Sequence, residues 1–363
     1  MSRVDAFLDL LLKQNGSDLH LVSGNPPRIR IYGEIHPVKY RELTEDETKD
    51  LLFEIMPDRV RTIFQANGGA DFGYELTGSS RFRVNAFRHR DGIGAVFRAI
   101  PEKIDTLDEL NMPPVLKALT RQRKGLILVS GPTGSGKSTT LAAMIDFINT
   151  ERKGHIITIE DPVEHVHKHN GCLISQREVG DHTESFASAL RSALREDPDV
   201  ILVGELRDLE TISLAVTAAE MGILILATLH TNGAAAAVDR IINVFPPGEE
   251  PYIRSMLSTS LCGVISQQLV KTADNRGRLA AVETLINNSA ASNIIREGKT
   301  EQLETVIQGS ALQGMQSIDM ALRRLLDEKL ITGEEAYRKA RLKSNFEQYR
   351  EQGEPIHTTT STF

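Results

Sequence analysis

Tryptophan is absent from this chain of 363 residues, and there are only two cysteines, Cys172 and Cys262. Two cysteines so far apart form neither a disulfide framework nor a metal-binding pair, which is typical of a reducing cytoplasm. The sequence also has no run of about 18 apolar residues, the length that a membrane-spanning helix needs. Near the start, Asp5, Asp9 and Lys13 stand among leucines, which predicts an amphipathic helix rather than a signal peptide. We therefore expect a cytoplasmic protein without a membrane span.

Basic charge is in short supply as well, because the formal net charge is −7. Domains that bind nucleic acid are usually basic, and a single-strand translocase needs basic loops lined with aromatic side chains. The sequence shows no such cluster, so nucleic acid is not an expected partner. The composition, 40% apolar and 25% charged, is that of a globular protein that buries a core. The length suggests two domains, with room for a third helical piece.

Residues 131–138 read GPTGSGKS and match the phosphate-binding loop (P-loop) pattern G-x-x-x-x-G-K-[ST] at every position. An apolar run, residues 126–129, precedes the loop and a helix-forming run, residues 138–144, follows it, as the motif requires. Glycines let backbone N–H groups curl around phosphates, and the helix start adds unpaired donors. We expect Lys137 to reach the β- and γ-phosphates of ATP and Ser138 to hold Mg²⁺. The predicted nucleotide-binding residues are Gly131, Pro132, Thr133, Gly134, Ser135, Gly136, Lys137, Ser138 and Thr139.

The residues before this motif predict a small α/β domain over residues 1–100. Thr44 and Glu47 form a capping box that opens a helix. Asp91 and Gly92 mark a turn between two strands of alternating pattern. The predicted strands are residues 17–22, 28–32, 81–89 and 93–99, and residues 101–114 are the expected linker.

From residue 115 to residue 345, short apolar runs alternate with helical patterns. Such alternation predicts a parallel sheet with helices on both faces. Beyond residue 285 the pattern is mostly helical, with a second capping box at Thr332 and Glu335. Residues 346–363, which end in a threonine-rich run, are expected to be a disordered tail. The expected strands are residues 126–129, 156–159, 200–203 and 223–227, and the expected helices are residues 184–195, 206–221 (closed by Gly222) and 234–242.

Three strand ends are predicted to meet at the P-loop, because ligands bind at the carboxyl ends of the strands in open parallel sheets. Glu160, Asp161 and Glu164 follow the first strand, and Glu164 is the expected base for the attacking water. The second strand lacks the usual terminal Asp, so the next acid, Glu205, is the expected metal-side carboxylate. His230 follows the third strand, where it either senses the γ-phosphate, links the phosphate to the subunit boundary, or is a structural histidine.

Arginines are candidates to neutralise the charge on the transferred phosphate. Alternation along residues 81–87 puts Arg81 and Arg83 on one face of a strand and apolar side chains on the other. Arg98, on the next strand, is placed to join them. Arg195, on the helix that leads into the strand at residues 200–203, is a candidate for contacts between subunits. The alternative for all four is a solvated surface charge.

His165, His167 and His169 alternate beside Glu164, with Cys172 nearby, and suggest part of a zinc site. Alternation on a strand places such side chains on one side. A structural zinc site usually takes a second pair of ligands from elsewhere in the chain, and no source is obvious. Zinc is therefore not an expected ligand.

At these motifs the chain resembles the PilT family of type IV pilus retraction ATPases, within the secretion ATPase superfamily. The resemblance implies a PAS-like amino-terminal domain and a RecA-like motor domain with a helical extension, with ATP between the two domains. It also implies a cytoplasmic homohexamer that docks on an inner-membrane pilus platform protein, with Arg81, Arg83 and Arg98 as arginine contacts. The matching stretches run from GSDLHL at residues 16–21 through SRFRVNAF at 80–87, the P-loop, IEDPVE at 159–164, EDPD to ELRD at 196–208 and TLHT at 228–231.

One departure from the family concerns a late motif. Retraction ATPases usually carry AIRNLIRE, whereas residues 290–297 here read AASNIIRE, with Ser292 in place of the first arginine. The alternative is therefore an accessory PilU-like paralogue, although the context of Arg195 resembles the principal motor more, and a paralogous retraction ATPase is a candidate partner. Pilus-assembly and type II secretion ATPases are less favoured, because they usually carry Cys-x-x-Cys zinc motifs. A non-catalytic nucleotide sensor would be expected to lose Glu164 or Glu205, and both are present.

Overall fold

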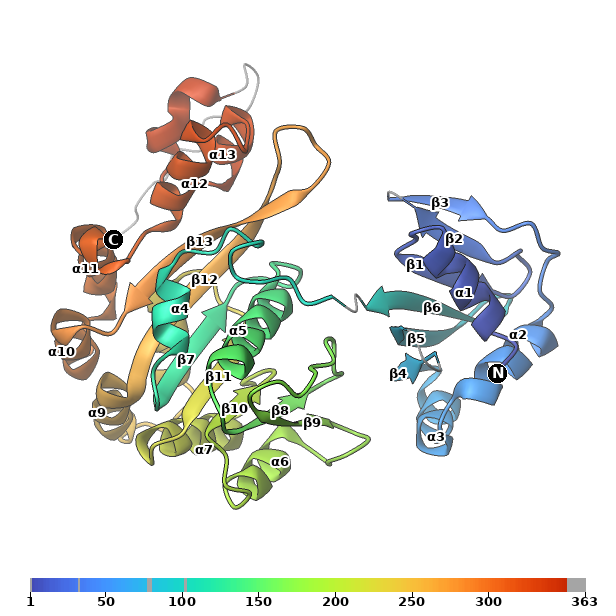
Figure 1. Cartoon of the computed structure of the whole chain (residues 1–363), viewed down its shortest axis with the longest axis horizontal. Coiled ribbons are helices and arrows are strands. Elements are labelled where there is room, and N and C mark those ends of the chain that lie inside the picture. Colours follow the sequence, from blue (N-terminus) through green and yellow to red (C-terminus); the bar gives the residue numbers. More distant parts are fainter. Residues whose placement is uncertain (1, 32, 77–79, 101–102, 351–363) are drawn as a thin grey trace. The chain divides into compact units, whose positions relative to one another are not determined.

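The computed structural model describes residues 2–31, 33–76, 80–100 and 103–350. These residues fold into two compact units (Figure 1). The first unit comprises Met1–Ile104 and Pro162–Val166, and the second comprises Asp105–Asp161 and His167–Phe363. Each unit has its own sheet and its own hydrophobic core.

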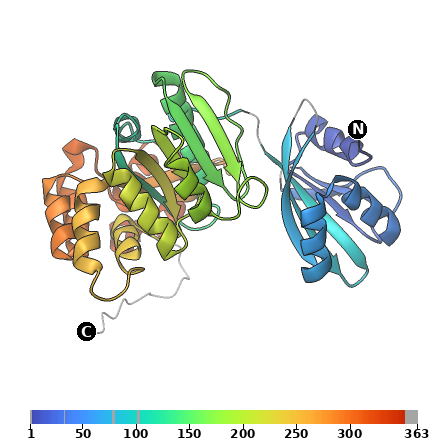
Figure 2. The same ribbon diagram turned by 90° about the horizontal axis from the view of Figure 1, so that it is seen from below.

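An antiparallel sheet of six strands forms the first unit, in the order β3-β2-β1-β6-β5-β4. Helices α1 (Asp5–Lys13), α2 (Glu45–Ile55) and α3 (Asp58–Asn67) cover one face of this sheet (Figure 2). The predicted amphipathic helix and the capping box of Thr44 and Glu47 are confirmed. The strands are β1 (Asp18–Val22), β2 (Arg28–Ile31), β3 (Glu34–Pro37), β4 (Gly69–Glu75), β5 (Arg81–His89) and β6 (Gly92–Ile100).

Strand β5 shows the alternation that its sequence predicts. The apolar side chains at positions 82, 84 and 86 are buried against the helices, whereas Arg81 and Arg83 lie on the opposite face. Arg83 is directly across from Arg98 in β6, and Arg98 is directly across from Asp18 in β1. The face of the sheet away from the helices therefore carries a row of charged side chains.

A sheet of seven strands forms the core of the second unit, in the order β13-β12-β7-β11-β10-β8-β9. Neighbouring strands are parallel except for the antiparallel pair β12–β13. Strands β7, β10 and β11 are buried at every position, as predicted for strands covered on both faces. The sequence does not predict β9, β12 and β13, because polar side chains interrupt their apolar runs. The strands are β7 (Gly125–Ser130), β8 (His155–Glu160), β9 (Leu173–Glu178), β10 (Val200–Val203), β11 (Leu224–Leu229), β12 (Leu261–Lys271) and β13 (Arg278–Ile286).

Helices pack on both faces of this sheet, which confirms the predicted layers (Figures 1 and 2). Two predicted helices are shorter than expected, because Ser185 caps α6 and Asp208 caps α7. Gly222 follows the end of α7 with a φ of +114°, as the predicted glycine cap requires. One face carries α4 (Val115–Thr120) and α5 (Lys137–Glu151), and the other carries α6 (Phe186–Ala193), α7 (Leu209–Glu220), α8 (Ala234–Ile242), α9 (Glu250–Ser260), α10 (Ser289–Glu297) and α11 (Leu303–Gly309).

The carboxyl-terminal part is helical, as predicted, and packs on Val270 and Ala281 of the β12–β13 pair. Thr332 caps α13, but the carboxylate of Glu335 accepts a hydrogen bond from the N–H of Lys271 at 3.0 Å. The acid of this predicted capping box, Glu335, therefore binds strand β12 through its side chain. The elements here are the 3-10 turns η1 (Thr300–Gln302) and η2 (Ala311–Gln313), helices α12 (Ile318–Asp327) and α13 (Gly333–Lys339), and the 3-10 helix η3 (Lys343–Tyr349).

Two expected boundaries differ from the structure. Leu107 and Met112, within the expected linker, are buried in the core of the second unit, because their side chains complete the layer of α4 and α5. Phe346, the first residue of the expected disordered tail, is 1% exposed within η3. The rest of that expectation, residues 351–363, lies outside the described residues.

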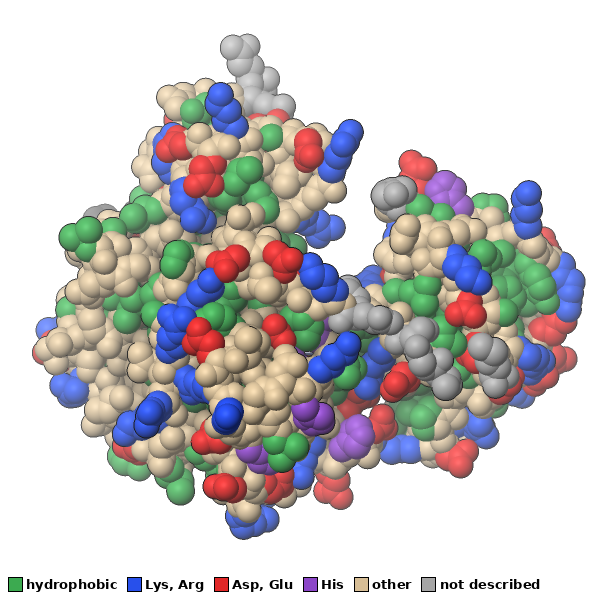
Figure 3. All heavy atoms as spheres, in the orientation of Figure 1, with side chains coloured by type: hydrophobic (Ala, Val, Ile, Leu, Met, Phe, Trp, Pro, Cys, Tyr) green, Lys and Arg blue, Asp and Glu red, His purple; other side chains and the backbone are tan. Residues whose placement is uncertain are grey.

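Acidic and basic side chains are interspersed on the face of each unit that Figure 3 shows. That pattern fits the modest net charge of −7. Over the described ranges, no helix has the length and the apolar content to cross a membrane.

Candidate nucleotide site

The P-loop connects the end of β7 to the start of α5 (Figure 1). Gly131 has a φ of +144°, and a Cβ there would lie 2.3 Å from the carbonyl oxygen of Gln267 and 2.6 Å from Oγ of Ser135. Gly136, with a φ of +87°, is the N-cap residue of α5. The predicted strand–loop–helix arrangement is therefore present, and the backbone requires glycine at both positions.

Lys137 is the first residue of α5 and is 8% exposed. Its ammonium donates to the carbonyl oxygens of Gly131 at 2.9 Å and Pro132 at 3.0 Å. The hydroxyl of Ser135 is buried, with no hydrogen-bond partner among the described residues. A buried ammonium, an unpaired hydroxyl and a loop without room for a Cβ together fit the phosphates of a nucleotide. Ser138 is exposed, so its hydroxyl is open to a metal ion.

Gln267 supports the P-loop from strand β12, a role that the sequence pattern does not predict. The side chain is 2% exposed, and its Nε2 donates to the carbonyl oxygen of Ser135 at 2.7 Å. The backbone carbonyl oxygen of Gln267 also limits the space at Gly131. The only local signal is a polar residue inside an apolar run, which does not indicate a contact across 132 residues of sequence.

The ends of β10 and β11 bring Glu205 and His230 to the P-loop, as the sequence predicts. Nε2 of His230 lies 3.5 Å from Oε1 of Glu205, and Nδ1 of His230 lies 3.5 Å from Oγ1 of Thr133. Burial alone would raise the pKa of Glu205, but the hydrogen bond and charge of Arg207, together with His230, lower it. Glu205 is therefore held in its ionised form, which a metal-side carboxylate requires.

Arg207 is a further residue of the site that the sequence pattern does not predict. Its Nη2 lies 2.7 Å from Oε2 of Glu205. That hydrogen bond raises the pKa of Arg207 despite its partial burial, and the charge of Asp161 at the end of β8 acts in the same direction. The sequence does contain a signal for this pair, because Arg207 lies only two positions after Glu205. Two residues so close in sequence stay close in the fold.

The acids that follow β8 separate into two groups. Oε1 of Glu160 accepts hydrogen bonds from Oγ1 of Thr158 at 2.7 Å and Nε2 of Gln176 at 3.2 Å, so it is held within the second unit. Glu164 lies on the short segment that packs with the first unit. There its Oε1 lies 3.7 Å from Nη1 of Arg83. Two of the predicted catalytic residues, Glu164 and Arg83, thus share an ion pair.

The other predicted arginines differ in their surroundings. Nε of Arg98 donates to Oδ1 of Asp18 at 2.9 Å, so its charge is paired within the first sheet. Arg81 is partly buried on the charged face of β5. Arg195 follows α6 and precedes the amino end of β10, whereas Glu205 follows the carboxyl end. Within one chain, the structure therefore does not bring Arg195 to the P-loop.

The alternating histidines lie on an irregular segment between β8 and β9, not on a strand. They are His165, His167 and His169. Nδ1 of His169 accepts a hydrogen bond from the N–H of Ile174 at 3.2 Å. Burial raises the pKa of the Cys172 thiol, which disfavours the thiolate that zinc needs. Within the part of the chain that the structure describes, no three His, Cys, Asp or Glu side chains are placed to hold a metal ion.

A P-loop at the end of a central parallel strand, with an ionised acid and a histidine at the two neighbouring strand ends, defines a P-loop nucleoside triphosphatase. The family model for the type II/IV secretion system protein matches residues 3–359, and the chain belongs to this family. The type IV pilus retraction ATPase PilT of Pseudomonas aeruginosa is 51% identical over 334 residues, which cover 92% of this chain and 97% of that protein. The type IV pilus ATPase PilU of the same organism is 42% identical over 332 residues, covering 92% and 87%.

Among solved structures, the crystal structure of the pilus retraction motor PilT with bound ADP matches with a TM-score of 0.88 at 42% identity. The match covers 96% of this chain and 99% of that one. These similarities confirm the predicted fold class, a PAS-like α/β unit followed by a RecA-like unit with a helical extension. The chain is an ATPase of this family and binds nucleotide.

Proposed function

We propose that this chain hydrolyses ATP to power the retraction of type IV pili. The observation that carries the proposal is the meeting of Glu205, His230 and the P-loop at one edge of the second sheet. Support for the mechanical output comes from the similarity to a pilus retraction motor, which extends over 96% of the chain. Twitching motility, which depends on retraction, is the expected phenotype.

Each residue of the site has a proposed role in the hydrolysis of ATP. Lys137 engages the β- and γ-phosphates, and Ser138 with Glu205 would hold Mg²⁺, whose charge offsets that of the phosphates when it is bound. Glu164 orients the attacking water and takes its proton as the water oxygen bonds to the γ-phosphorus. The bond from that phosphorus to the bridging oxygen then breaks, and ADP leaves with the electron pair.

Arginines are proposed to balance the negative charge that builds on the transferred phosphate. Arg81 and Arg83 lie side by side on the charged face of β5, and Arg98 is across from Arg83 on β6. A planar guanidinium binds two phosphate oxygens at once, which suits this role. Arg98 is paired with Asp18 and Arg83 with Glu164, so both guanidiniums lie beside carboxylates within the first unit.

We further propose that six copies assemble into a closed ring in the cytoplasm, docked on an inner-membrane pilus platform protein. A closed cyclic ring uses head-to-tail interfaces, in which two different surfaces of each chain meet. Arg195 supports such an arrangement, because it lies away from its own P-loop and carries one exposed guanidinium. Light scattering with an ATP analogue present tests the assembly, and a fully active monomer would contradict it.

An accessory PilU-like role is the alternative, and Ser292 in α10 favours it. The hydroxyl of Ser292 donates to the carbonyl oxygen of Ser258 at 2.8 Å, so this position is tied to the end of α9. Overall similarity points the other way, since identity is 51% to PilT and 42% to PilU. The principal retraction motor is therefore the better supported reading.

Deletion of the gene tests the proposed function. A strain without it should accumulate surface pili and stop retracting them, and the wild-type gene should restore retraction. The Lys137→Ala gene should not restore it, because the lysine is needed for turnover. Retraction at the parental rate in the deletion strain would rule out the principal motor role. Loss of retraction only when a second retraction ATPase is also removed would indicate the accessory role.

A further inference from the structure

The loop that carries His230, residues 230–233, leads into α8. Two side chains of the β12–β13 pair accept hydrogen bonds from the backbone at this junction. Gly233 is the N-cap residue of α8 and has no side chain with which to cap it. Its N–H donates to Oγ of Ser266 at 2.9 Å, and the N–H of Ala234 donates to Oε1 of Glu283 at 2.7 Å. Ser266 and Glu283 are direct partners across the two strands. The start of α8 is therefore capped by a buried strand pair rather than by its own sequence.

Glu283 holds this loop with one oxygen and an arginine with the other. The glutamate is 1% exposed, and Nη2 of Arg341 lies 2.9 Å from its Oε2. The same guanidinium packs against the loop, because a Cβ at Gly233 would lie 2.8 Å from Nη2 of Arg341. A buried carboxylate needs a partner of this kind, since leaving its charge unpaired is costly.

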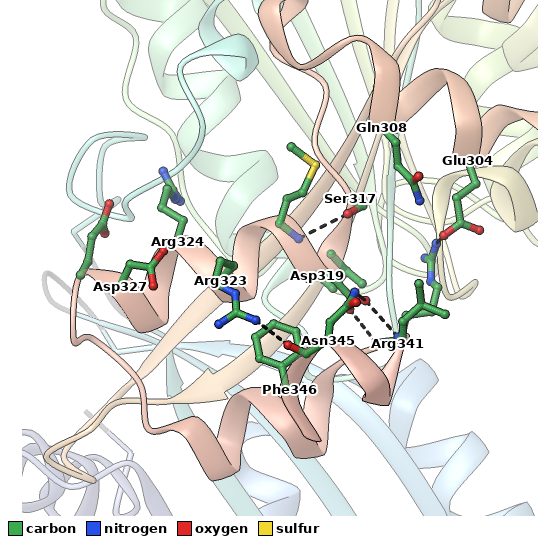
Figure 4. A pocket seen from close by; sticks show the side chains of 14 residues that line it. Glu304, Gln308, Ser317, Asp319, Arg323, Arg324, Asp327, Arg341, Asn345 and Phe346 are labelled. Carbon is green, nitrogen blue, oxygen red and sulfur yellow. Dashed lines mark hydrogen bonds and ion pairs between the residues drawn. The ribbon is translucent and has the colours of Figure 1, made fainter. Parts of the chain in front are cut away.

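Arg341 is in turn anchored to the carboxyl-terminal helices (Figure 4). Its Nη1 lies 3.3 Å from Oε1 of Glu304 in α11. Its backbone N–H donates to Oδ1 of Asp319 in α12 at 2.8 Å. These contacts line a cavity of about 840 Å³ among the carboxyl-terminal helices. On its other side, Arg341 lines a second cavity, of about 260 Å³, together with Pro132 of the P-loop and Gly233. One side chain thus lies between the nucleotide site and the helical extension.

We propose that Glu283 and Arg341 are positioning residues for ATP hydrolysis, which fix the loop of residues 230–233 so that His230 stays against Glu205. The proposal rests on the proposed role of His230 at the nucleotide site. Neither residue touches the reacting atoms; both act through the backbone of Gly233 and Ala234. The pair also makes the position of His230 dependent on the placement of α11 and α12.

Removal of the pair should reduce the rate constant more than the affinity for ATP. A displacement of about 1 Å at a catalytic group can lower the rate as much as 10²-fold, so we expect kcat to fall roughly 10- to 100-fold in Arg341→Ala. The P-loop itself is untouched, so KM and ADP binding should stay close to wild type. Arg341→Lys keeps a positive charge opposite Glu283 but loses the guanidinium, which contacts Glu283 and Glu304 at the same time. This variant should give an intermediate kcat.

The experiment compares full-length variants in ATP turnover, in the binding of a fluorescent ADP analogue and in melting temperature. Arg338→Ala is the matched control, because Arg338 also pairs with a buried acid, Glu335, in the carboxyl-terminal part, and its contacts among the described residues do not include the loop. The Glu283→Gln variant keeps an oxygen for the N–H of Ala234 and loses the charge. The double variant Glu283→Gln/Arg341→Ala should turn over ATP no more slowly than Arg341→Ala alone. Both changes remove the same interaction, the ion pair between Glu283 and Arg341.

Each possible outcome either supports or overturns the proposal. A lower kcat with near-normal KM in Arg341→Ala, partly rescued in Arg341→Lys and absent from Arg338→Ala, supports the proposal. A wild-type kcat in Arg341→Ala, or a loss that Arg338→Ala shares at the same melting temperature, overturns it. If Arg341→Ala does not fold, a wild-type kcat in Arg341→Lys overturns it just as well. His230→Ala, measured alongside, separates the two claims: a normal kcat there refutes the proposed role of His230 itself, whereas a loss there with normal Arg341→Ala refutes the positioning pair alone.

Discussion

Arg98 and Asp18 face each other across strands β6 and β1, and Nε of Arg98 donates to Oδ1 of Asp18 at 2.9 Å. The pair gives Arg98 a structural partner in the sheet before any phosphate is near. Arg83, directly across from Arg98 on the other side, lies near the carboxylate of Glu164 instead. The charged face of the first unit is therefore an ordered row and not a set of independent solvated side chains.

The first prediction concerns Arg81 and Arg83. If they balance charge on the transferred phosphate, Arg81→Ala and Arg83→Ala should each lower ATP turnover strongly, since such arginines are worth roughly 10³–10⁵ in kcat. Replacement by lysine should rescue little, because lysine lacks the planar fork. Arg90→Ala is the control, because Arg90 is exposed and pairs only with its neighbour Asp91 in the β5–β6 turn among the contacts described. Normal turnover in Arg81→Ala, in Arg83→Ala and in the double variant would reduce both to surface charges.

The second prediction is a pH dependence of stability at Asp18. Burial alone would raise its pKa, but hydrogen bonds from Ser17 and Arg98 outweigh burial and lower the pKa below its ordinary value of 3.8. A group whose folded pKa is depressed contributes stability above its unfolded pKa and loses that contribution as the pH falls through the folded pKa. Asp18→Asn should therefore cost about 1–2 kcal/mol at pH 7, at the low end because Arg98 is itself 71% exposed. Melting curves should show the difference shrinking below about pH 4; a difference that is constant from pH 7 to pH 3 would contradict it.

The third prediction tests Glu164 as the base for the attacking water. Glu164→Gln keeps the size of the side chain and removes its ability to take a proton, so turnover should fall on the order of 10²–10⁴ while nucleotide binding persists. Phosphate release and the binding of a fluorescent ADP analogue measure the two effects separately. Hydrolysis at the wild-type rate would assign the base elsewhere, with Glu160 the next acid to examine.

The fourth prediction concerns the support of the P-loop by Gln267. Gln267→Leu keeps the bulk in the core but leaves the carbonyl oxygen of Ser135 without its donor, which costs about 1–3 kcal/mol for a buried group. Part of that cost should appear as a lower affinity of the P-loop for the phosphates of ATP. We therefore expect the KM for ATP to rise roughly tenfold. Gln268→Leu is the matched control, because Nε2 of Gln268 donates to the carbonyl oxygen of Lys339 at 3.0 Å and not to the P-loop. Equal KM values in the two variants would remove Gln267 from the site.

Much of the second unit can be predicted from sequence because its signals are local. The P-loop is one unbroken motif, and β10 and β11 are runs of apolar residues whose ends point to Glu205 and His230. Once the strands are assumed to be parallel, their carboxyl ends lie at the same edge of the sheet, which predicts that Glu205 and His230 both approach the P-loop.

The remaining parts of the site depend on contacts that are distant in sequence. Gln267 and Glu283 lie on β12 and β13, which the apolar pattern does not reveal, because each strand mixes buried polar residues with apolar ones. Their partners, Ser135 and Ala234, are recognisable only after the strands are paired with the P-loop layer. The histidines at positions 165 to 169 show why alternation alone is a weak signal, since the chain is irregular there. Periodicity there has no sheet partner to stabilise it.

The most direct test of the account is Mg²⁺-dependent ATP turnover by the purified full-length chain and its Glu205→Gln variant. The carboxylate of Glu205 lies 3.5 Å from His230 beside the P-loop, and its lowered pKa keeps it ionised at neutral pH. We predict that the wild-type chain releases phosphate only when Mg²⁺ is present, and that Glu205→Gln binds nucleotide but turns over at least about 10²-fold more slowly. Wild-type turnover in Glu205→Gln, or turnover that does not depend on Mg²⁺, would contradict the account.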